Sequence, residues 1–344
     1  MEPLPYRPYP EKHRHRDEWI LARRPHREAV SPWLANGCFL ELERTAAGSV
    51  VQSATILLTN RECPLRCLMC DLWKGTLAER VPVGAIPAQI KNALSELQPR
   101  LGPDQPLRQL KLYNAGSFFD PKAIPPEDYE AIAELSAPFE RIIVECHPAF
   151  LGDRSLQFQE LLARANARQF GSRKPAPALE VAIGLESAHP EVLARLNKQM
   201  SLQQFSRAAR FLDQHQIALR VFVLVQPPFL TDAAESIDWA ERSMSFAFEA
   251  KATVVCAIPT RAGNGALDAL QSEGLFNPPT LATIEAAQAR GLTLRQGRVF
   301  TDLWELRRFS ACGHCFEERY GRLQRMNLEQ EWIARPACAH CTGA

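Results

Sequence analysis

Six apolar runs rich in β-branched residues recur along the middle of the chain, with helical patterns between them. The runs are residues 53–60, 108–116, 141–148, 179–186, 218–227 and 251–259. Strands that are almost continuously hydrophobic and alternate with helices are typical of a parallel sheet. After the first run the spacing settles to roughly 35 residues, the size of one strand–helix unit. The pattern therefore predicts an α/β fold built from six such units.

Four stretches carry apolar residues at three- and four-residue spacing, which predicts amphipathic helices. They are residues 126–135, 155–169, 201–214 and 233–247. Ser201 and Asp232 stand where N-cap residues are expected. Six strand–helix units suit a partial barrel, and a doubly wound open sheet is the structural alternative.

The composition limits the classes of protein that the chain can represent. Its 344 residues are 46% hydrophobic and 23% charged, with a formal net charge of +1. Such a chain as a whole does not attract nucleic acid or anionic membranes by its charge. The apolar run from Val221 to Val225 is too short to span a bilayer. The ten cysteines cluster, which indicates metal binding in a reducing compartment, and we expect a cytoplasmic protein.

Three cysteines follow the first predicted strand at C-x3-C-x2-C spacing: Cys63, Cys67 and Cys70. Thiolates are the usual ligands of iron–sulfur clusters, and a ferredoxin-type cluster takes four. Three thiolates would leave one iron open to another ligand. The alternatives are buried structural cysteines or part of a zinc site. A structural zinc site needs a fourth ligand nearby, and none follows Cys70 within the usual reach.

This loop and its position after a strand resemble the radical S-adenosylmethionine (SAM) superfamily. The resemblance covers residues 53–259 and implies a partial (βα)6 TIM-like barrel. It also implies a [4Fe-4S] cluster whose open iron binds SAM, and an electron donor of the flavodoxin or ferredoxin type. One electron from the cluster would cleave SAM to methionine and a 5′-deoxyadenosyl radical, which would abstract a substrate hydrogen.

Polar residues gather where the predicted strands end, which is where barrels of this kind place their chemistry. Residues 115–117, with Gly116 at their centre and Ser117 at their end, correspond to the family's "GGE" segment, which holds the SAM amino group. The segment reads Ala-Gly-Ser here, so the resemblance leaves Asn114 or Ser117 to replace the glutamate. The alternative for Gly116 is a simple turn residue.

Glu186 lies in a stretch similar to the branch that contains the Elongator catalytic subunit, where this glutamate contacts SAM. A buried carboxylate needs a partner, and a salt bridge to a neighbouring Arg or Lys is the alternative. Glu145 and His147 share one face of the third predicted strand. They are the candidate catalytic residues, for proton transfer or substrate positioning. The alternative is that His147 is a structural residue with its hydrogen bonds satisfied.

A second cysteine group lies near the C-terminus, as two C-x2-C pairs about twenty residues apart. Its members are Cys312, Cys315, Cys338 and Cys341. The spacing fits a zinc site and equally an auxiliary [4Fe-4S] cluster. Between the pairs, arginines alternate with aromatic residues, a combination that suits RNA. The alternative is an amphipathic helix whose charged face is solvated.

Taken together, the sequence predicts an N-terminal extension (1–50), a core barrel (51–262) and a C-terminal extension with the four-cysteine metal site (263–344). The segments NREC, CDLWK and GLES resemble the Elongator-like and archaeosine-synthase-type branch, which implies modification of tRNA or a nucleoside. The alternatives are a radical SAM enzyme acting on a small metabolite or peptide, and a non-catalytic zinc or iron–sulfur module that binds RNA.

Overall fold

The computed structural model describes residues 8–102 and 105–341, and its centre is one eight-stranded sheet. The strands are β1 (Gly37–Arg44), β2 (Val50–Leu58), β3 (Leu107–Asn114), β4 (Arg141–Glu145), β5 (Ala178–Glu186), β6 (Ala218–Val225), β7 (Val254–Pro259) and β8 (Arg298–Thr301). They lie side by side in chain order. Only the β1–β2 pair is antiparallel; every other neighbouring pair is parallel.

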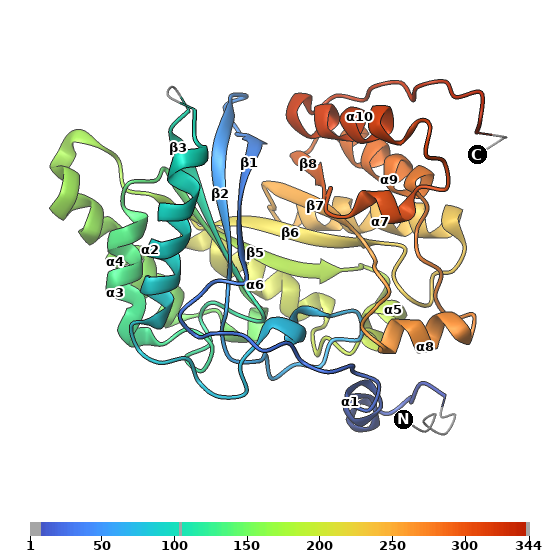
Figure 1. Ribbon diagram of the computed structural model, residues 1–344, viewed down its shortest axis with the longest axis horizontal. Helices are drawn as coiled ribbons and strands as arrows, with labels where there is room; N and C mark the ends of the chain where they lie inside the picture. The colour runs from blue at the N-terminus through green and yellow to red at the C-terminus, as the bar shows by residue number, and fades with distance from the viewer. Residues whose placement is uncertain (1–7, 103–104, 342–344) are drawn as a thin grey trace.

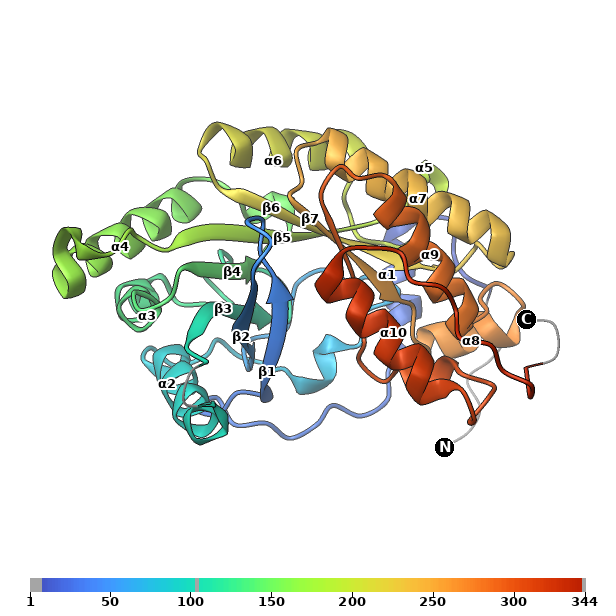
Figure 2. The same cartoon turned by 90° about the horizontal axis from the view of Figure 1, so that it is seen from above.

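The strands β2 to β7 are the six predicted strands, and the expected α/β class with an incomplete barrel is confirmed. Figure 2 shows the sheet curling into an open barrel rather than forming a flat, doubly wound layer. The apolar runs did not indicate β1 or β8. Strand β1 has no apolar run, because Phe39, Glu41 and Glu43 share one of its faces and two of these three residues are charged. Strand β8 is only four residues long.

Ten α-helices accompany the sheet in the described part of the chain. They are α1 (His13–Leu21), α2 (Ala85–Leu97), α3 (Tyr129–Ser136), α4 (Asp153–Phe170), α5 (Pro190–Arg195), α6 (Leu202–Gln214), α7 (Ala233–Glu249), α8 (Ala266–Ser272), α9 (Leu281–Thr293) and α10 (Phe316–Glu329). Helices α2, α3, α4, α6 and α7 cover the convex side of the sheet (Figure 2).

The two predicted N-caps are confirmed. Ser201 accepts a hydrogen bond from the backbone N–H of Gln204 at 3.2 Å, and Gln204 returns one to the Ser201 N–H at 2.8 Å. Asp232 accepts one from the backbone N–H of Glu235 at 2.8 Å. These bonds satisfy donors that the first turn of a helix otherwise leaves free.

Buried charges fill the inside of the barrel toward the amino ends of its parallel strands. Arg220 on β6 donates to Glu180 on β5 at 2.6 Å and to Glu43 on β1 at 2.5 Å, while Lys111 on β3 lies 2.7 Å from Glu43. Strands β1 and β6 are not neighbours in the sheet, so these contacts cross the barrel interior. Each buried charge therefore has an opposite partner, which offsets the cost of removing it from water.

Helix α10 covers the free edge of β8. The side-chain amide of Asn327 bonds both the N–H and the C=O of Thr301, at 2.8 and 2.9 Å. The Gln330 amide does the same for Val299, at 2.7 and 3.0 Å. Two side chains thus replace a missing neighbouring strand and block the edge from pairing with another chain. Figure 1 shows α10 at the end of the sheet opposite α1 and α8.

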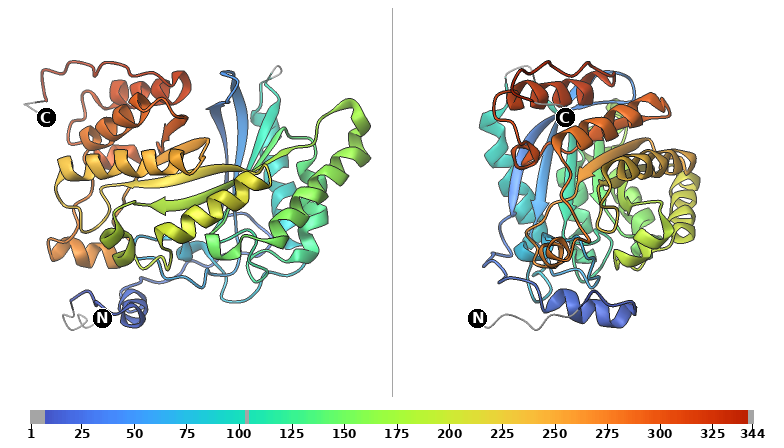
Figure 3. Two further views of the ribbon diagram at one scale, coloured as in Figure 1. Left: turned by 180° about the vertical axis from the view of Figure 1, so that it is seen from behind. Right: turned by 90° about the vertical axis from the view of Figure 1, so that its right-hand side faces the viewer.

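The predicted domain boundaries stay a prediction, and the outermost residues of the two extensions, 1–7 and 342–344, lie outside the described residues. Both extensions pack on the barrel, α1 beneath the lower strand ends in each view of Figure 3 and α10 across the top. All ten cysteines are free thiols. Among the described helices, none combines the length and the apolar character that crossing a membrane requires.

Candidate functional site

A cavity of about 290 Å³ lies at the carboxyl ends of the parallel strands. Its wall comes from the loop after β2 and from the ends of β3, β4, β5, β6 and β7. Seven of the predicted site residues line it: Cys63, Cys67, Cys70, Gly116, Glu145, His147 and Glu186. These residues are up to 123 positions apart in the sequence, and the parallel topology brings them to one place.

The cysteine loop, which we define as residues 61–71, is fixed through its backbone. Asn264, in the segment after β7, donates from its side-chain amide to the carbonyls of Leu68 at 2.8 Å and Cys70 at 3.2 Å. The Leu68 N–H donates to the Leu196 carbonyl at 2.9 Å, and the Leu68 side chain is fully buried. The loop therefore has a set shape before any ligand binds. Asn264 was missed at the sequence level, because a lone polar residue in a connecting segment carries no local signal.

The three thiols of this loop are buried deeply enough to hold their protons. Burial raises the pKa of Cys63 to about 11 and the pKa values of Cys67 and Cys70 to about 12. A thiol must lose its proton to bind a metal. A cationic metal or cluster would therefore supply the charge that stabilises three thiolates at this place.

Gly116 lies directly against Cys63. Its φ of +128° belongs to a backbone region that favours glycine. A Cβ at this position would stand 3.0 Å from Cys63 Cβ and 3.2 Å from its Sγ. The glycine thus allows the end of β3 to approach the first cysteine closely, which a turn alone would not require.

Glu186 sits at an irregularity in the β5–β6 register with a φ of 66°, a strained conformation for a residue with a side chain. Lys198 donates to its carboxylate at 2.6 Å, and both side chains are buried. A Cβ on Gly184 would overlap the Glu186 carboxylate and lie 2.6 Å from Lys198 Nζ, so this glycine makes room for the pair. The salt bridge named as the alternative for Glu186 is therefore present in the structure.

Glu145 and His147 both line the cavity, but they differ in their hydrogen bonds and in the direction of their pKa shifts. Burial raises the pKa of Glu145 to about 8, against the opposing effect of Lys198, and no hydrogen bond to its carboxyl group is found among the described residues. His147 Nδ1 accepts from the Ala149 N–H at 3.2 Å, and Nε2 lies 3.2 Å from the Lys198 carbonyl. Burial, with Lys198 nearby, lowers the pKa of His147 to about 4. Glu145 is thus free to meet a ligand, whereas the backbone occupies both nitrogens of a neutral His147.

Asn114 and Ser117 lie outside the cavity lining. The Ser117 hydroxyl accepts from the backbone N–H of His147 at 2.9 Å, which ties the ends of β3 and β4 together. Asn114 shares the face of Leu110 and Leu112, since side chains alternate along a strand and Lys111 faces the barrel interior. Its amide is buried without a hydrogen-bond partner in the described part of the chain. The structure does not bring these two side chains to the cavity.

The second cysteine group does come together. The Sγ atoms of its four members, which are Cys312, Cys315, Cys338 and Cys341, all lie within 4.8 Å of one another. Cys312 and Cys338 are 3.9 Å apart, and Cys315 and Cys341 are 3.5 Å apart. Backbone N–H groups of Cys315 and His314 point at Cys312 and lower its pKa to about 6. Hydrogen bonds to Cys315 and Cys312 raise the pKa of Cys341 to about 12, so the arrangement favours a thiolate, the form that binds metal, at Cys312 but not at Cys341.

The arginines between the two cysteine pairs are largely used inside the protein. Arg319 bonds Glu285 through two nitrogens, at 3.0 and 2.7 Å, and Arg322 lies 3.2 Å from the same carboxylate. All three side chains are buried. Arg335 also approaches Glu285, at 3.9 Å, which leaves Arg325 as the exposed arginine of the segment. A surface for RNA built from all four arginines is therefore not present in this conformation.

No protein-family model matches the chain. Among curated proteins, an uncharacterized protein of Methanocaldococcus jannaschii is 23% identical over 54% of the chain and 49% of its own length. The archaeosine synthase subunit beta of Thermococcus kodakarensis is 27% identical over 51% of the chain and 52% of its own length. The chain thus spans about half the length of the curated relatives it matches.

Solved structures include archaeal Elp3 from Methanocaldococcus infernus, with a TM-score of 0.49 and 12% identity over 70% of the chain and 59% of Elp3. They also include coproporphyrinogen III oxidase from Escherichia coli, a radical SAM enzyme, with a TM-score of 0.41 and 11% identity over 77% of the chain and 52% of the oxidase. The sequence similarity to archaeosine synthase subunit beta agrees with the branch that the segments NREC, CDLWK and GLES predict. That relative is named as a synthase subunit, so an enzyme stays the expectation for this chain.

Proposed function

We propose that the chain is a radical SAM enzyme whose cysteine loop holds a [4Fe-4S] cluster and whose cavity receives SAM and the reacting part of the substrate. One observation carries this proposal: three cysteines from one loop and the ends of five further strands line a single cavity. A structural role for the cysteines does not explain why Glu145 and Glu186 face the same space.

The residues present fit the two cofactors. The cysteine loop is preshaped by Asn264, and Gly116 leaves room beside Cys63. The cavity volume of about 290 Å³ is at the lower end of the range of small-molecule sites, roughly 300–1,000 Å³. When bound, the cluster and SAM supply a one-electron cleavage that yields methionine and a 5′-deoxyadenosyl radical able to abstract a hydrogen atom.

The chain's own residues would hold and orient the cofactor. Glu186 offers a carboxylate to a hydroxyl or ammonium group, and Lys198 holds that carboxylate in place. Glu145, which keeps its proton near neutral pH, offers either an O–H donor or, on losing it, an acceptor. Leu65, Met69 and Leu224 make part of the wall apolar, which limits the water around a reactive radical.

Metal analysis of a Cys63→Ala/Cys67→Ala/Cys70→Ala variant tests the cluster assignment. We expect the wild-type protein, reconstituted anaerobically with iron and sulfide, to hold about four irons at this loop. The triple variant should lose them. The matched control is Cys38→Ala, because Cys38 is a buried core cysteine outside the cavity. Equal iron in the wild-type protein and the triple variant would refute the assignment.

We further propose that the substrate is a tRNA or a nucleoside. This proposal is supported by the sequence similarity to archaeosine synthase subunit beta. Mass spectrometry of tRNA nucleosides from a deletion strain tests it: one modified nucleoside should disappear and return with the wild-type gene but not with Cys70→Ala. An unchanged nucleoside profile would favour a small metabolite or a peptide as the substrate.

For the four-cysteine group we propose a single zinc ion. A tetrahedral zinc with Zn–S bonds of about 2.3 Å places its sulfurs about 3.8 Å apart, and the observed separations of 3.9 and 3.5 Å are similar. Four thiolates on four different irons would stand farther apart, since each lies outside its own corner of the cluster. The triple alanine variant should keep one zinc and no iron; residual iron in that variant would indicate an auxiliary cluster instead.

A further inference from the structure

The cysteine loop separates two hollows. Cys63, Leu65 and Cys67 line the cavity that we assign to SAM, whereas Pro64 and Arg66, between them in the sequence, line a second groove of about 550 Å³. Successive Cα atoms are only about 3.8 Å apart. The second groove therefore reaches the cysteines from the side opposite the cavity, through the thickness of one loop.

This second groove carries a surplus of positive charge. Its ionisable residues are Arg61, Arg66, Lys122 and Arg154 against Glu62 and Asp120. They come from the cysteine loop, the loop after β3 and the first turn of α4. Because these positions are scattered through the sequence, no charge run in the chain marks the groove.

Of the two acidic residues of the groove, Glu62 is neutralised by ion pairs, whereas Asp120 has only a backbone hydrogen bond. Glu62 lies 2.7 Å from Arg24 and 3.0 Å from Arg66, and it also pairs with Arg27. Asp120 is buried, and its carboxylate accepts from the backbone N–H of Lys122 at 2.9 Å.

The remaining cations of the groove are uncompensated. The side chains of Lys122 and Arg154 are exposed, and within the described residues neither they nor Arg61 form an ion pair. Three cations are thus available to an external anionic surface.

We infer that this groove is the docking site of an acidic one-electron carrier protein. The inference rests on the proposed function, because reductive cleavage of SAM consumes one electron in each event. The carrier would lose one electron and the cluster would pass it to SAM. When the S–C5′ bond breaks, the methionine sulfur would keep this electron together with one electron of the bond, and C5′ would keep the other as the radical. SAM and substrate occupy the cavity side of the loop, so a protein donor must approach from the other side.

An acidic carrier fits the groove better than RNA does. The cysteine loop lies between the groove and the cavity, so a nucleotide held in the groove is outside the reaction site. Electron transfer needs only proximity to the cluster, not entry into the cavity. Complexes between redox proteins also have small interfaces and are short-lived. Complementary charge raises their association rate strongly at low salt.

Reduction kinetics with two reductants test the inference. Stopped-flow absorbance would follow the reconstituted cluster as it is reduced by reduced flavodoxin, an acidic carrier, and separately by dithionite, which needs no docking site. The variant is Lys122→Glu/Arg154→Glu, whose two side chains are exposed and lie outside the SAM cavity. We expect the flavodoxin rate at low salt to fall at least tenfold and the dithionite rate to stay unchanged.

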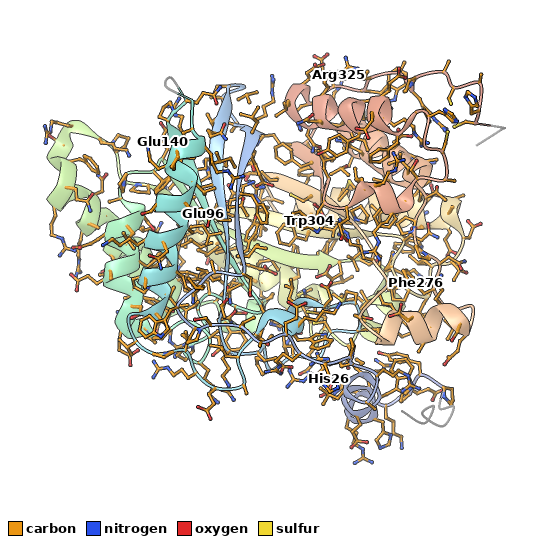
Figure 4. The ribbon with its side chains drawn as sticks, in the orientation of Figure 1. His26, Glu96, Glu140, Phe276, Trp304 and Arg325 are labelled. Atoms are coloured by element: carbon orange, nitrogen blue, oxygen red, sulfur yellow. The ribbon has the colours of Figure 1, made fainter. Side chains whose placement is uncertain are left out.

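A matched variant, Arg210→Glu/Arg325→Glu, makes the same charge change elsewhere on exposed helix surfaces. Arg210 lies on α6. Arg325 lies on α10, at the opposite end of the molecule from His26 (Figure 4). The matched variant should leave the flavodoxin rate and the dithionite rate at the wild-type level. Calorimetric titration with oxidised flavodoxin gives a readout independent of SAM chemistry, and the groove variant should bind at least tenfold more weakly than the matched variant.

Unchanged flavodoxin binding and reduction in the groove variant would overturn the inference. If that variant instead lost affinity for a tRNA transcript, the groove would belong to RNA. An equal fall of the flavodoxin and dithionite rates would also overturn it, because the defect would then not be in docking. Failure of the wild-type protein to cleave SAM with dithionite would count against the proposed function alone. The flavodoxin titration would still test whether the groove binds an acidic carrier.

Discussion

Lys198 donates a hydrogen bond to Glu186 across 2.6 Å at the wall of a cavity that three free cysteines also line. The contact with Lys198 fixes where the buried Glu186 carboxylate points. A hydroxyl or ammonium group entering the cavity can then bond the remaining lone pairs of Glu186 without reorganising the wall.

The variant Glu186→Gln tests this role. A hydrogen bond to a charged group is worth about 1.5–3 kcal/mol. We therefore expect SAM affinity, measured by equilibrium dialysis on reconstituted protein, to fall roughly 10- to 100-fold, with the iron content unchanged. Glu191→Gln, on the exposed face of α5, is the matched control. Wild-type affinity in Glu186→Gln would remove this residue from the SAM site.

A second prediction concerns the contact between Gly116 and Cys63. Alanine at position 116 would press its Cβ to 3.0 Å from Cys63 Cβ, so we expect Gly116→Ala to lose most of its reconstituted iron. Gly84→Ala is the control, because Gly84 also has a positive φ, +87°, but meets no atom within 4 Å. Both variants should lose about 1 kcal/mol of stability from the backbone conformation. Only the first should lose iron, and equal iron in the two would exclude the steric role.

Glu145 gives a pH-dependent prediction for cluster-free protein. Its pKa of about 8 in the folded state lies above the value of about 4.3 expected for an unfolded chain. The folded protein thus holds this proton more tightly, and stability is lost as the pH rises from about 4 to about 8. Thermal unfolding should show the stability of Glu145→Gln rising relative to that of the wild type over that range, by at most about 5 kcal/mol at pH 9, since one pKa unit corresponds to about 1.4 kcal/mol. Glu331→Gln, at an exposed site, should change stability with pH in the same way as the wild type. If Glu145→Gln also showed the pH dependence of the wild type, the raised pKa of Glu145 would be contradicted.

The buried charges inside the barrel predict a large loss of stability. Arg220→Met would leave Glu180 and Glu43 with fewer partners in the interior, and removing one member of a buried pair costs about 3–5 kcal/mol. Arg164→Met breaks an exposed pair with Glu160 and should cost less than about 0.5 kcal/mol. Chemical denaturation would measure both; similar losses would mean that the interior network contributes little.

The sequence predicted those strands whose hydrophobic pattern follows directly from burial. Strands β2 to β7 are buried on both faces and mostly apolar, with charges at single positions such as Lys111, Glu180 and Arg220, so their apolar runs stand out. Strand β1 carries no such run: Glu41 is exposed, and Glu43 reads as a surface residue although it is buried in the charged interior. The cysteine loop was visible because its ligands are local in sequence.

Residues whose role depends on long-range geometry could not be predicted. Asn264 holds a loop almost 200 positions away, and no pattern near it indicates that contact. Asn114 was placed near SAM, but a one-residue difference along a strand moves a side chain to the other face. The alternation of Arg319 and Arg322 with aromatic residues suggested RNA, whereas their partner Glu285 lies on a different helix.

The production of 5′-deoxyadenosine by the reconstituted protein tests the central claim most directly. Wild-type protein, loaded anaerobically with iron and sulfide and then given SAM and dithionite, should release 5′-deoxyadenosine and methionine in equal amounts. Cys70→Ala should release neither. A wild-type protein that holds the cluster and is reduced by dithionite, yet forms no 5′-deoxyadenosine, would contradict the assignment of this cavity to radical SAM chemistry.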